Sequence, residues 1–311
     1  MTRGTGAAGT GLWVSEESFT QPLVTPEWLA GQLGRAGLVI LDASVGKDRL
    51  RGPWIPGARI FDIDGEMSAH GDGLPPHTMP EPGQFQASVR NLGIDRDTCV
   101  VVYDAAGIYS SARAWWMLRA MGHRRVAVLD GGLPAWLDAG LPAVEAPYVP
   151  DDGRPDHPDT DFTARPVEGA FVGSDEVREA LEAGGAVDGV GAGAAAGPVV
   201  MDARSRGRFA GTEPEPRAGL RGGHMPGSVN LPFGELMGAG GRMRPEEELR
   251  AVFGQLAEEQ RTLIVSCGSG VTACVLALGA EIAGYREVSV YDGSWSEWGR
   301  EGAETPVASA P

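Results

Sequence analysis

A cysteine stands where a buried strand gives way to a helix, and this position is well suited to covalent chemistry. The run 263–278 reads LIVSCGSGVTACVLAL: an apolar segment with β-branched residues, then Cys267 and two glycines, then a helical pattern of leucines and small residues. A thiol at the carboxyl end of a strand lies close to the N-terminus of the following helix, which attracts negative charge. Such surroundings favour the reactive thiolate over the thiol.

The loop after this cysteine also suits the binding of an anion. We expect its backbone N–H groups all to point inward and to form a nest around a negative charge. The residues of the expected nest are Gly268, Ser269, Gly270, Val271 and Thr272. The alternative is a buried structural cysteine, which is the more common role of a lone Cys. Two glycines disfavour that alternative, because a packed turn needs them only where its backbone approaches another group closely.

Composition and charge exclude several classes of partner. The chain has 311 residues, 42% of them hydrophobic, and a net charge of −16, which disfavours nucleic acid and anionic membranes. No apolar run approaches the ~20 residues of a membrane span. Residues 1–20 carry no signal-peptide pattern and are expected to form a disordered tail. The three cysteines, Cys99, Cys267 and Cys274, form no disulfide framework, so we expect a cytoplasmic protein.

Short buried strands alternate with helices along the chain. Strands are expected at 38–42, 59–63, 100–104, 126–130, 199–202 and 263–266, and helices at 25–33 and 82–92 and after most other strands. This order predicts an α/β protein with parallel sheets covered by helices on both faces. Residues 64–81, between a strand and a helix, form a long polar loop that contains His70 and His77.

The same order of landmarks occurs twice. Asp42 and Asp202 each end a strand and lie 160 positions apart, and Asp130 and Asp292 lie 162 apart. We therefore expect two tandem domains of one kind, 20–145 and 167–304, joined by a Pro- and Asp-rich linker at 146–166. Asp104 stands 163 positions before Cys267, in the corresponding place. A carboxylate cannot act as a sulfur nucleophile, so the first copy is expected to be catalytically silent. The Gly/Ala-rich run 184–197 is expected to be a surface loop.

Several motifs together resemble the two-domain rhodanese family of sulfurtransferases over about residues 20–304. They are DAR at 202–204, GRFAGTEPEPR at 207–217, GHMPGSVN at 223–230, CGSGVT at 267–272 and YDGSW at 291–295. The CGSGVT loop looks like that of the members that use 3-mercaptopyruvate, whereas members that prefer thiosulfate tend to carry basic residues directly after the cysteine.

The resemblance implies sulfur transfer through a covalent intermediate; no cofactor is expected, and no spacing of Cys and His residues suggests a zinc site. Cys267 would take sulfur from a small-molecule donor, 3-mercaptopyruvate, release pyruvate, and hold the sulfur as a persulfide. Cyanide or a thiol, such as a small thiol or a thioredoxin-like protein, would then accept it. Arg208 and Arg217 match family positions that hold the donor's carboxylate and carbonyl, for which a guanidinium suits two parallel bonds. Arg204 and Arg206 are expected to be structural or on the surface.

The resemblance also implies a proton relay of Ser269, His77 and Asp64, with the last two supplied by the first domain. His70 competes with His77 for this place, and either could be an exposed histidine without a role. Cys274 and Cys99 are expected to be structural.

Three other interpretations of the function remain open. The principal one is that thiosulfate, rather than 3-mercaptopyruvate, is the main sulfur donor. A non-catalytic rhodanese-like binding module is disfavoured by the cysteine and both arginines. A cysteine phosphatase is disfavoured because residues 268–273 contain no basic residue for a phosphate.

Overall fold

The computed structural model describes residues 21–148, 160–184, 197–258 and 261–309. The expected N-terminal tail, most of the Gly/Ala-rich run and the middle of the expected linker lie outside the described residues. The described part contains two five-stranded parallel sheets, ordered β1-β5-β4-β2-β3 and β6-β10-β9-β7-β8. We refer to the parts of the chain built on these sheets as the first and second domains.

The elements of the first domain, in chain order, are β1 (Leu23–Val24), α1 (Pro26–Ala30), β2 (Leu38–Asp42), η2 (Gly46–Asp48), β3 (Ala58–Ile60), α2 (Pro82–Asn91), β4 (Cys99–Tyr103), α3 (Ser111–Ala120), β5 (Val126–Leu129) and α4 (Gly132–Asp138). Those of the second are β6 (Phe171–Val172), α5 (Ser174–Gly184), β7 (Val199–Asp202), α6 (Arg206–Ala210), β8 (Val229–Asn230), η3 (Phe233–Leu236), η4 (Ala239–Gly241), α7 (Glu246–Gly254), β9 (Leu263–Ser266), α8 (Ala273–Ile282), β10 (Val288–Tyr291) and α9 (Ser294–Trp298).

The two sheets repeat one strand order, so the internal repeat seen in the sequence is confirmed as a structural repeat. In the first sheet Asp42 pairs with Tyr103, and in the second Asp202 pairs with Ser266. Both pairs lie at the carboxyl ends of central strands. The next residues along the chain, Asp104 and Cys267, therefore occupy equivalent positions at the sheet edge where ligands bind in α/β folds.

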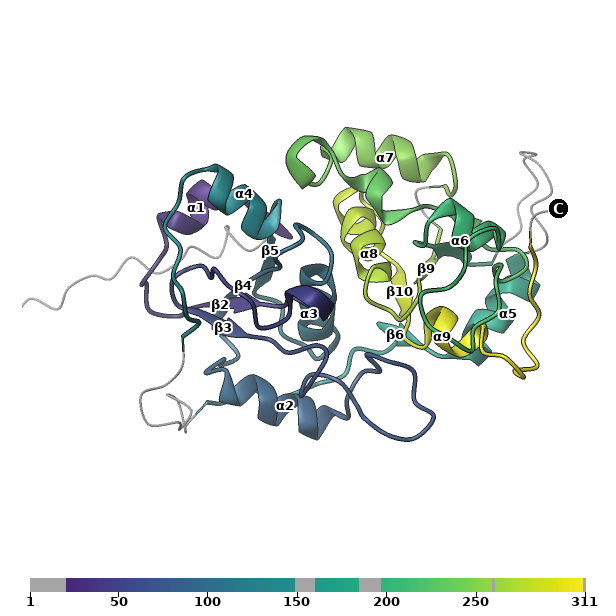
Figure 1. Cartoon of the computed structure of the whole chain (residues 1–311), viewed down its shortest axis with the longest axis horizontal. Helices are drawn as coiled ribbons and strands as arrows, with labels where there is room; N and C mark the ends of the chain where they lie inside the picture. The colour runs from purple at the N-terminus through teal and green to yellow at the C-terminus, as the bar shows by residue number, and fades with distance from the viewer. Residues whose placement is uncertain (1–20, 149–159, 185–196, 259–260, 310–311) are drawn as a thin grey trace, which may run out of the picture.

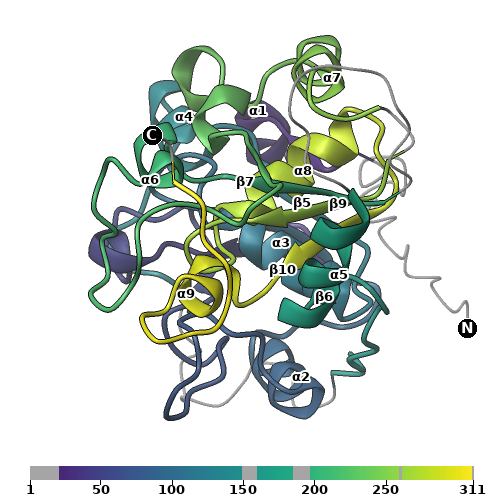
Figure 2. The ribbon, with the colours of Figure 1, turned by 90° about the vertical axis from the view of Figure 1, so that its right-hand side faces the viewer.

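Helices cover both faces of the second sheet, as expected. Along β9 the side chain of Val265 packs in the cluster that holds α7 and α8, whereas Ile264 packs in the cluster of α5 and α9. Figure 2, which has the second domain in front, shows these helix pairs on opposite sides of the strands. A strand buried on both faces needs apolar residues at consecutive positions, which explains the continuous apolar run before Cys267.

Two expected elements are shorter in the structure. Thr25 caps α1 through its side chain, as expected, but the helix ends at Ala30 rather than at 33. The strand expected at 59–63 is β3, Ala58–Ile60. After Phe61, whose N–H bonds the carbonyl of Asp42, the chain turns back on itself because Gly65 and Met67 both donate to the carbonyl of Asp62.

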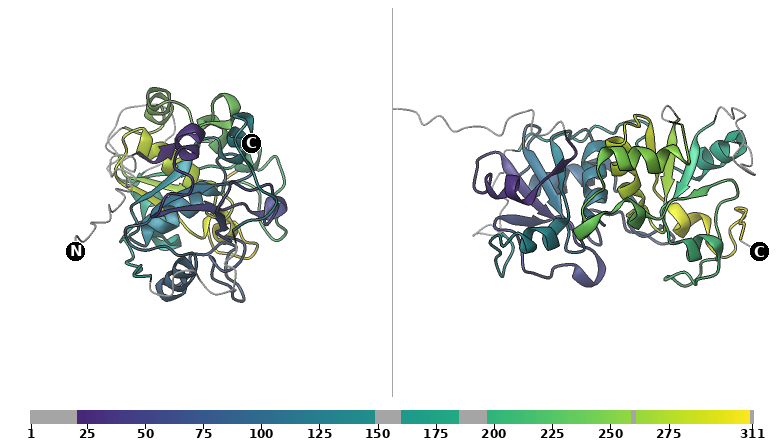
Figure 3. Two further views of the ribbon diagram at one scale, coloured as in Figure 1. Left: turned by 90° about the vertical axis from the view of Figure 1, so that its left-hand side faces the viewer. Right: turned by 90° about the horizontal axis from the view of Figure 1, so that it is seen from above.

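The domains lie side by side, with α3 and α8 packed against each other between them (Figure 1; Figure 3, right). All residues of α3 except Arg119 are buried, and one hydrophobic cluster extends through α3 and α8 into both domains. A helix that is apolar on nearly all sides is typical of such an interior position. No helix among the described residues is long and apolar enough to cross a membrane.

Candidate active site

Cys267 lies in a cavity of about 350 Å³ between the two domains, with 2% of its surface exposed. The first domain contributes Val45, Gly46, Asp64, His77 and Tyr109, and the second contributes Arg208, Pro216, Arg217, Cys267, Gly268, Ser269, Val271 and Thr272. Because the thiol follows β9 directly and borders a cavity lined with polar groups, its surroundings differ from those of a structural cysteine in a packed core.

The YDGSW segment supports the cysteine loop from behind. The Ser294 hydroxyl oxygen accepts hydrogen bonds from the N–H groups of Cys267 and Gly270, each at 3.1 Å. The N–H and hydroxyl of Ser296 both donate to the carbonyl of Gly268. The expectation that every loop N–H points into the cavity is therefore wrong for Gly270, whose N–H is held by a side chain behind the loop. Gly268, Ser269, Val271 and Thr272 do line the cavity.

His77 links the two domains at the edge of this cavity. Its Nδ1 lies 3.0 Å from the hydroxyl of Ser269, and its Nε2 lies 2.8 Å from a carboxylate oxygen of Asp64. The second oxygen of Asp64 accepts the N–H of Gly46 at 2.7 Å. The structure thus brings together the three residues of the expected relay. His70 is exposed and its Nε2 lies 2.8 Å from the carbonyl of Gly65, so it does not take the place of His77.

The surroundings of His77 favour the neutral ring. Burial lowers the pKa of His77, the carboxylate of Asp64 opposes this shift, and the charges of Arg113 and Arg217 add to the lowering. Because the carboxylate of Asp64 accepts a hydrogen bond from Nε2–H, Nδ1 of the neutral ring carries no proton and is an acceptor for the Ser269 hydroxyl. His77 also has a φ of 64°, a left-handed conformation that is uncommon for a residue with a Cβ.

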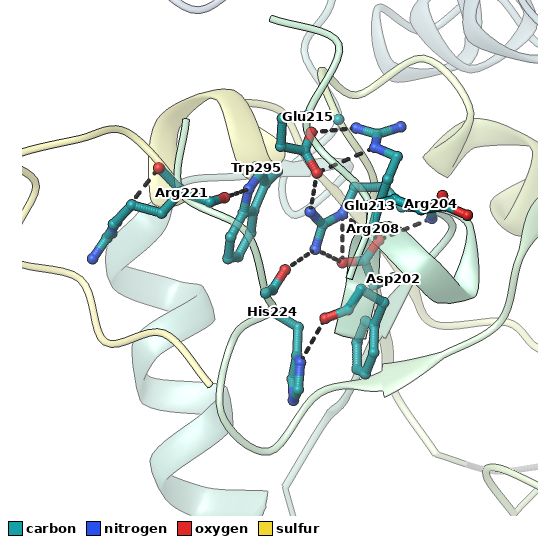
Figure 4. Close-up of polar contacts among 12 residues, drawn as sticks. Asp202, Arg204, Arg208, Glu213, Glu215, Arg221, His224 and Trp295 are labelled. Carbon is teal, nitrogen blue, oxygen red and sulfur yellow. Dashed lines mark hydrogen bonds and ion pairs between the residues drawn. The ribbon is translucent and has the colours of Figure 1, made fainter. Parts of the chain in front are cut away.

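The two expected substrate-binding arginines differ in their surroundings. Nε and Nη2 of Arg208 both donate to the buried carboxylate of Glu215, at 3.2 and 2.6 Å (Figure 4). Glu215 thus occupies the Nε–Nη2 edge of the guanidinium, and two parallel bonds to a donor would have to use the Nη1–Nη2 edge. Arg217 is exposed and forms no ion pair with any residue in the described ranges, so both of its edges are available.

Both guanidinium groups lie above the cysteine loop. A Cβ added at Gly268 would come within 3.0 Å of Nη2 of Arg208 and 3.8 Å of Nη1 of Arg217. The glycine therefore allows two positive charges to approach the loop closely. Both charges favour an anion in the cavity.

Arg204 and Arg206 have the structural and surface positions that we expected. Arg204 is fully buried and donates to Asp202 and to Glu215, with its guanidinium 4.1 Å from the ring centre of Trp295 (Figure 4). Arg206 is exposed and pairs with Glu235. Since Glu215 accepts from both Arg204 and Arg208, the buried network fixes the position of Arg208 over the loop.

Sequence reasoning missed three residues of the site. Tyr109 forms part of the cavity wall and packs edge-on against Phe233. Partial burial raises the pKa of Tyr109, so its phenol stays neutral. Arg113 and Asp292 form an ion pair of 2.7 Å behind the loop. Tyr109 lies five residues after Asp104, as Thr272 lies five after Cys267, so the repeat itself could have indicated Tyr109.

In the first domain the backbone N–H groups of the equivalent loop bind the side-chain carboxylate of Asp104. The carboxylate of Asp104 accepts the N–H groups of Ala106, Tyr109, Ser110 and Ser111 at 2.8–3.0 Å. A buried carboxylate thus satisfies a nest of backbone donors at the position that corresponds to Cys267.

The other two cysteines are free and buried. Burial raises the pKa of Cys274 to about 12, so this thiol is neutral, and its sulfur lies 3.2 Å from the carbonyl of Gly270. Cys99 is the first residue of β4. Within the described ranges, no group of three or more His, Cys, Asp or Glu side chains is placed to hold a metal ion.

Comparison with known proteins agrees with this geometry. The model of the rhodanese-like domain matches residues 25–139 and 175–301. The chain is 39% identical over 303 residues to human 3-mercaptopyruvate sulfurtransferase, covering 92% of this chain and 94% of the human protein. It is 38% identical over 295 residues to rat thiosulfate sulfurtransferase, covering 89% and 92%. The crystal structure of SseA from Escherichia coli, described as a 3-mercaptopyruvate sulfotransferase with the rhodanese fold, has a TM-score of 0.73 at 32% identity and covers 89% of this chain and 100% of that one.

The two matched segments coincide with the two sheets, and the likeness to these relatives extends over most of the chain. A duplicated α/β domain with a cysteine loop in the second copy is thus explained by common descent, and the chain belongs to the rhodanese family of sulfurtransferases.

Proposed function

We propose that this protein transfers sulfur from 3-mercaptopyruvate, through a persulfide on Cys267, to a thiol or cyanide. The observation that carries the choice of donor is the hydrogen-bonded chain from Asp64 through His77 to Ser269. Pyruvate leaves as an enolate and needs a proton at carbon, whereas thiosulfate leaves as sulfite and does not. A proton relay beside the cysteine is therefore useful for the first donor and not for the second.

In the first half-reaction the Cys267 thiolate attacks the donor's sulfur. A bond forms between the two sulfur atoms, the carbon–sulfur bond breaks, and its electron pair stays on the carbon of the enolate. The donor brings one thiol proton and the carbon takes up one, so the protons balance. Nδ1 of neutral His77 can take up the donor's thiol proton through the hydroxyl of Ser269, and Asp64 stabilises the resulting imidazolium. Ser269 then passes a proton from His77 to the carbon of the enolate.

The arginines hold the other end of the donor. Arg217 has both edges of its guanidinium available for the donor's carboxylate, and Arg208 can add a donor from Nη1 while Glu215 keeps it in place. The loop itself supplies only N–H groups and the Ser269 hydroxyl next to the sulfur. A compact dianion such as thiosulfate would gain most from cations directly beside the cysteine, at positions that Gly268 and Ser269 occupy here.

In the second half-reaction an acceptor takes the outer sulfur and restores Cys267. Small thiols and thioredoxin-like proteins are the acceptors that we propose, and the three unpaired cysteines suit a reducing compartment, for which we propose the cytoplasm. The first domain, with Asp104 in place of the thiol, supplies His77 and Asp64 but forms no persulfide of its own.

A comparison of the two donors tests the proposal. We expect a higher kcat/KM for 3-mercaptopyruvate than for thiosulfate, and one added sulfur atom on the intact wild-type protein after treatment with 3-mercaptopyruvate. Cys267→Ser should lose this addition and all turnover while keeping its thermal unfolding temperature. Sulfur found on Cys274 or Cys99 would contradict the assignment of the nucleophile, and a preference for thiosulfate would contradict that of the donor.

A further inference from the structure

We infer that Arg113, a buried arginine of the first domain, is a positioning residue that holds the backbone of His77 so that the imidazole meets Ser269 on the cysteine loop. The inference rests on the proposed function, because Arg113 would affect turnover only through the His77 relay. Arg113 is the third residue of α3 and is fully buried. It does not line the donor's cavity, and it contacts His77 through the backbone carbonyl of that residue.

The guanidinium of Arg113 joins three segments that are far apart in the sequence. Its Nη2 donates to the carbonyl of His77 at 2.7 Å and to the carboxylate of Asp292 at 2.7 Å. Its Nη1 lies 3.4 Å from the carbonyl of Gly270, on the cysteine loop. One side chain thus connects the histidine segment of the first domain with the loop that carries Cys267.

Asp292 completes the support of the histidine segment. Its second carboxylate oxygen accepts the N–H of Met79 at 2.7 Å. The carbonyl of His77 and the N–H of Met79 are therefore both held by the Arg113–Asp292 pair. Two fixed points within three residues limit the conformations that the backbone between them can adopt.

The two hydrogen bonds to the carbonyl of His77 and the N–H of Met79 hold His77 in an unfavourable backbone conformation. A φ of 64° is unfavourable for a residue with a Cβ, and such conformations persist only where the surroundings hold them. If the two bonds were lost, the segment could return to a negative φ, which would reorient the ring relative to Ser269 and Asp64. The relay would then lose its alignment while the cysteine loop kept its own support from Ser294.

The alternative is a buried ion pair that only joins the domains. The same helix provides a second, more exposed ion pair between the domains, because Arg119 pairs with Glu281 of α8 at 2.9 Å. Arg119 does not line the cavity of Cys267 and donates to no carbonyl of the histidine segment. Substitution of Arg119 therefore controls for the loss of an interdomain ion pair, whereas substitution of Arg113 also releases His77.

A double-mutant cycle with His77→Ala tests the inference. Arg113→Lys keeps the charge, but a single ammonium cannot reproduce the forked geometry of a guanidinium. We expect Arg113→Lys to lower kcat for 3-mercaptopyruvate by roughly tenfold to a hundredfold with little change in KM, and to lower thiosulfate turnover much less. In the His77→Ala background the same substitution should change kcat by less than about twofold, because the two residues act through one pathway. Arg119→Lys should leave kcat unchanged in both backgrounds.

The pH profile gives a second readout. The charged and titratable groups around His77 are Asp64 at Nε2, Arg113 at its carbonyl, and the other such groups that line the cavity: Tyr109, Arg208, Arg217 and Cys267. Removing the positive charge with Arg113→Met should move the acid limb of the 3-mercaptopyruvate profile to higher pH, whereas Arg113→Lys should not move it. A purely structural role predicts the same profile for both variants.

The outcomes separate this inference from the proposed function. Should Arg113→Lys keep its full effect in the His77→Ala background, or slow both donors equally, the positioning role is wrong while the proposed function stands. Should His77→Ala itself leave 3-mercaptopyruvate turnover unchanged, the relay and the role of Arg113 are both wrong. If Arg113→Lys does not fold, Asp292→Asn enters the same cycle, because it removes one of the two carboxylate oxygens that hold Arg113 and Met79.

Discussion

Replacing Ser269 with alanine should separate the two sulfur donors. The change removes the hydroxyl that lies 3.0 Å from Nδ1 of His77 and leaves the pair of His77 with Asp64 in place. Persulfide formation from 3-mercaptopyruvate then lacks a proton donor for the leaving enolate. Thiosulfate releases sulfite without protonation at carbon, so the same variant should use thiosulfate almost normally.

The size of the loss follows from the role of a positioned acid. Such a group contributes about a hundredfold to ten-thousandfold to a rate. The lower part of this range applies here, because a cavity of about 350 Å³ can admit water that partly replaces the hydroxyl. We therefore expect kcat for 3-mercaptopyruvate to fall by about a hundredfold to a thousandfold, which corresponds to about 3–4 kcal/mol in the barrier.

Rapid-quench measurement of the first pyruvate released is the appropriate assay, since it reports the first half-reaction alone. Ser269→Thr keeps a hydroxyl at the same position and serves as the matched control, with a smaller loss expected. The reasoning is refuted if Ser269→Ala releases pyruvate at the wild-type rate, or if its turnover of thiosulfate falls by the same factor as that of 3-mercaptopyruvate.

Two further predictions concern the donor's carboxylate and the stability of the first domain. Arg217→Lys should lower kcat/KM for 3-mercaptopyruvate by roughly tenfold to a hundredfold, the cost of a charged hydrogen bond, and thiosulfate less; equal losses in steady-state kinetics would mean that Arg217 only attracts anions. Burial lowers the pKa of His123 to about 4, so the folded state resists protonation of this ring. The free energy of unfolding should consequently fall by about 3 kcal/mol as the pH drops from about 6.5, where the unfolded chain gains the proton, to about 4. Urea unfolding of His123→Leu across this range should lack that decrease, and an unchanged acid slope would exclude His123 as its source.

The sequence could predict the elements on which the site is built, because parallel strands place their carboxyl ends at one edge of a sheet. Apolar runs that end in Asp or Cys mark those ends, and their repetition at a nearly constant offset predicted two equivalent sheets. The prediction that Cys267 takes the place of Asp104 is confirmed by the equivalent pairings of Asp42 with Tyr103 and of Asp202 with Ser266. The choice of His77 over His70 came from the family resemblance, since both lie in one polar loop.

The contacts that adjust the site were beyond sequence reasoning, because they join distant positions. Arg113 and Asp292 are 179 residues apart, and no local pattern marks either as half of a pair. The effect of Glu215 on Arg208 likewise depends on how the loop after α6 folds back.

Ser294 is an exception, because the internal repeat could have indicated its role. It corresponds to Gly132 of the first domain, and both have a positive φ, of 48° and 57°.

The two copies of this loop differ in the residue that adopts the positive φ and in what that residue contacts. In the first domain Gly132 adopts the positive φ, and a Cβ there would clash with the carbonyls of Gly107 and Asp104. In the second domain a serine takes the same conformation, and its hydroxyl holds the N–H groups of Cys267 and Gly270.

A nest of backbone donors needs an anion or another acceptor, since buried unpaired N–H groups are costly. In the first domain the carboxylate of Asp104 meets that need. In the second domain Ser294 satisfies two of the donors from behind and leaves the cavity face of the loop to the sulfur. The first domain thus keeps the same fold as the second, while its loops place His77, Asp64 and Tyr109 at the cavity of Cys267 and its α3 places Arg113 against the carbonyl of His77.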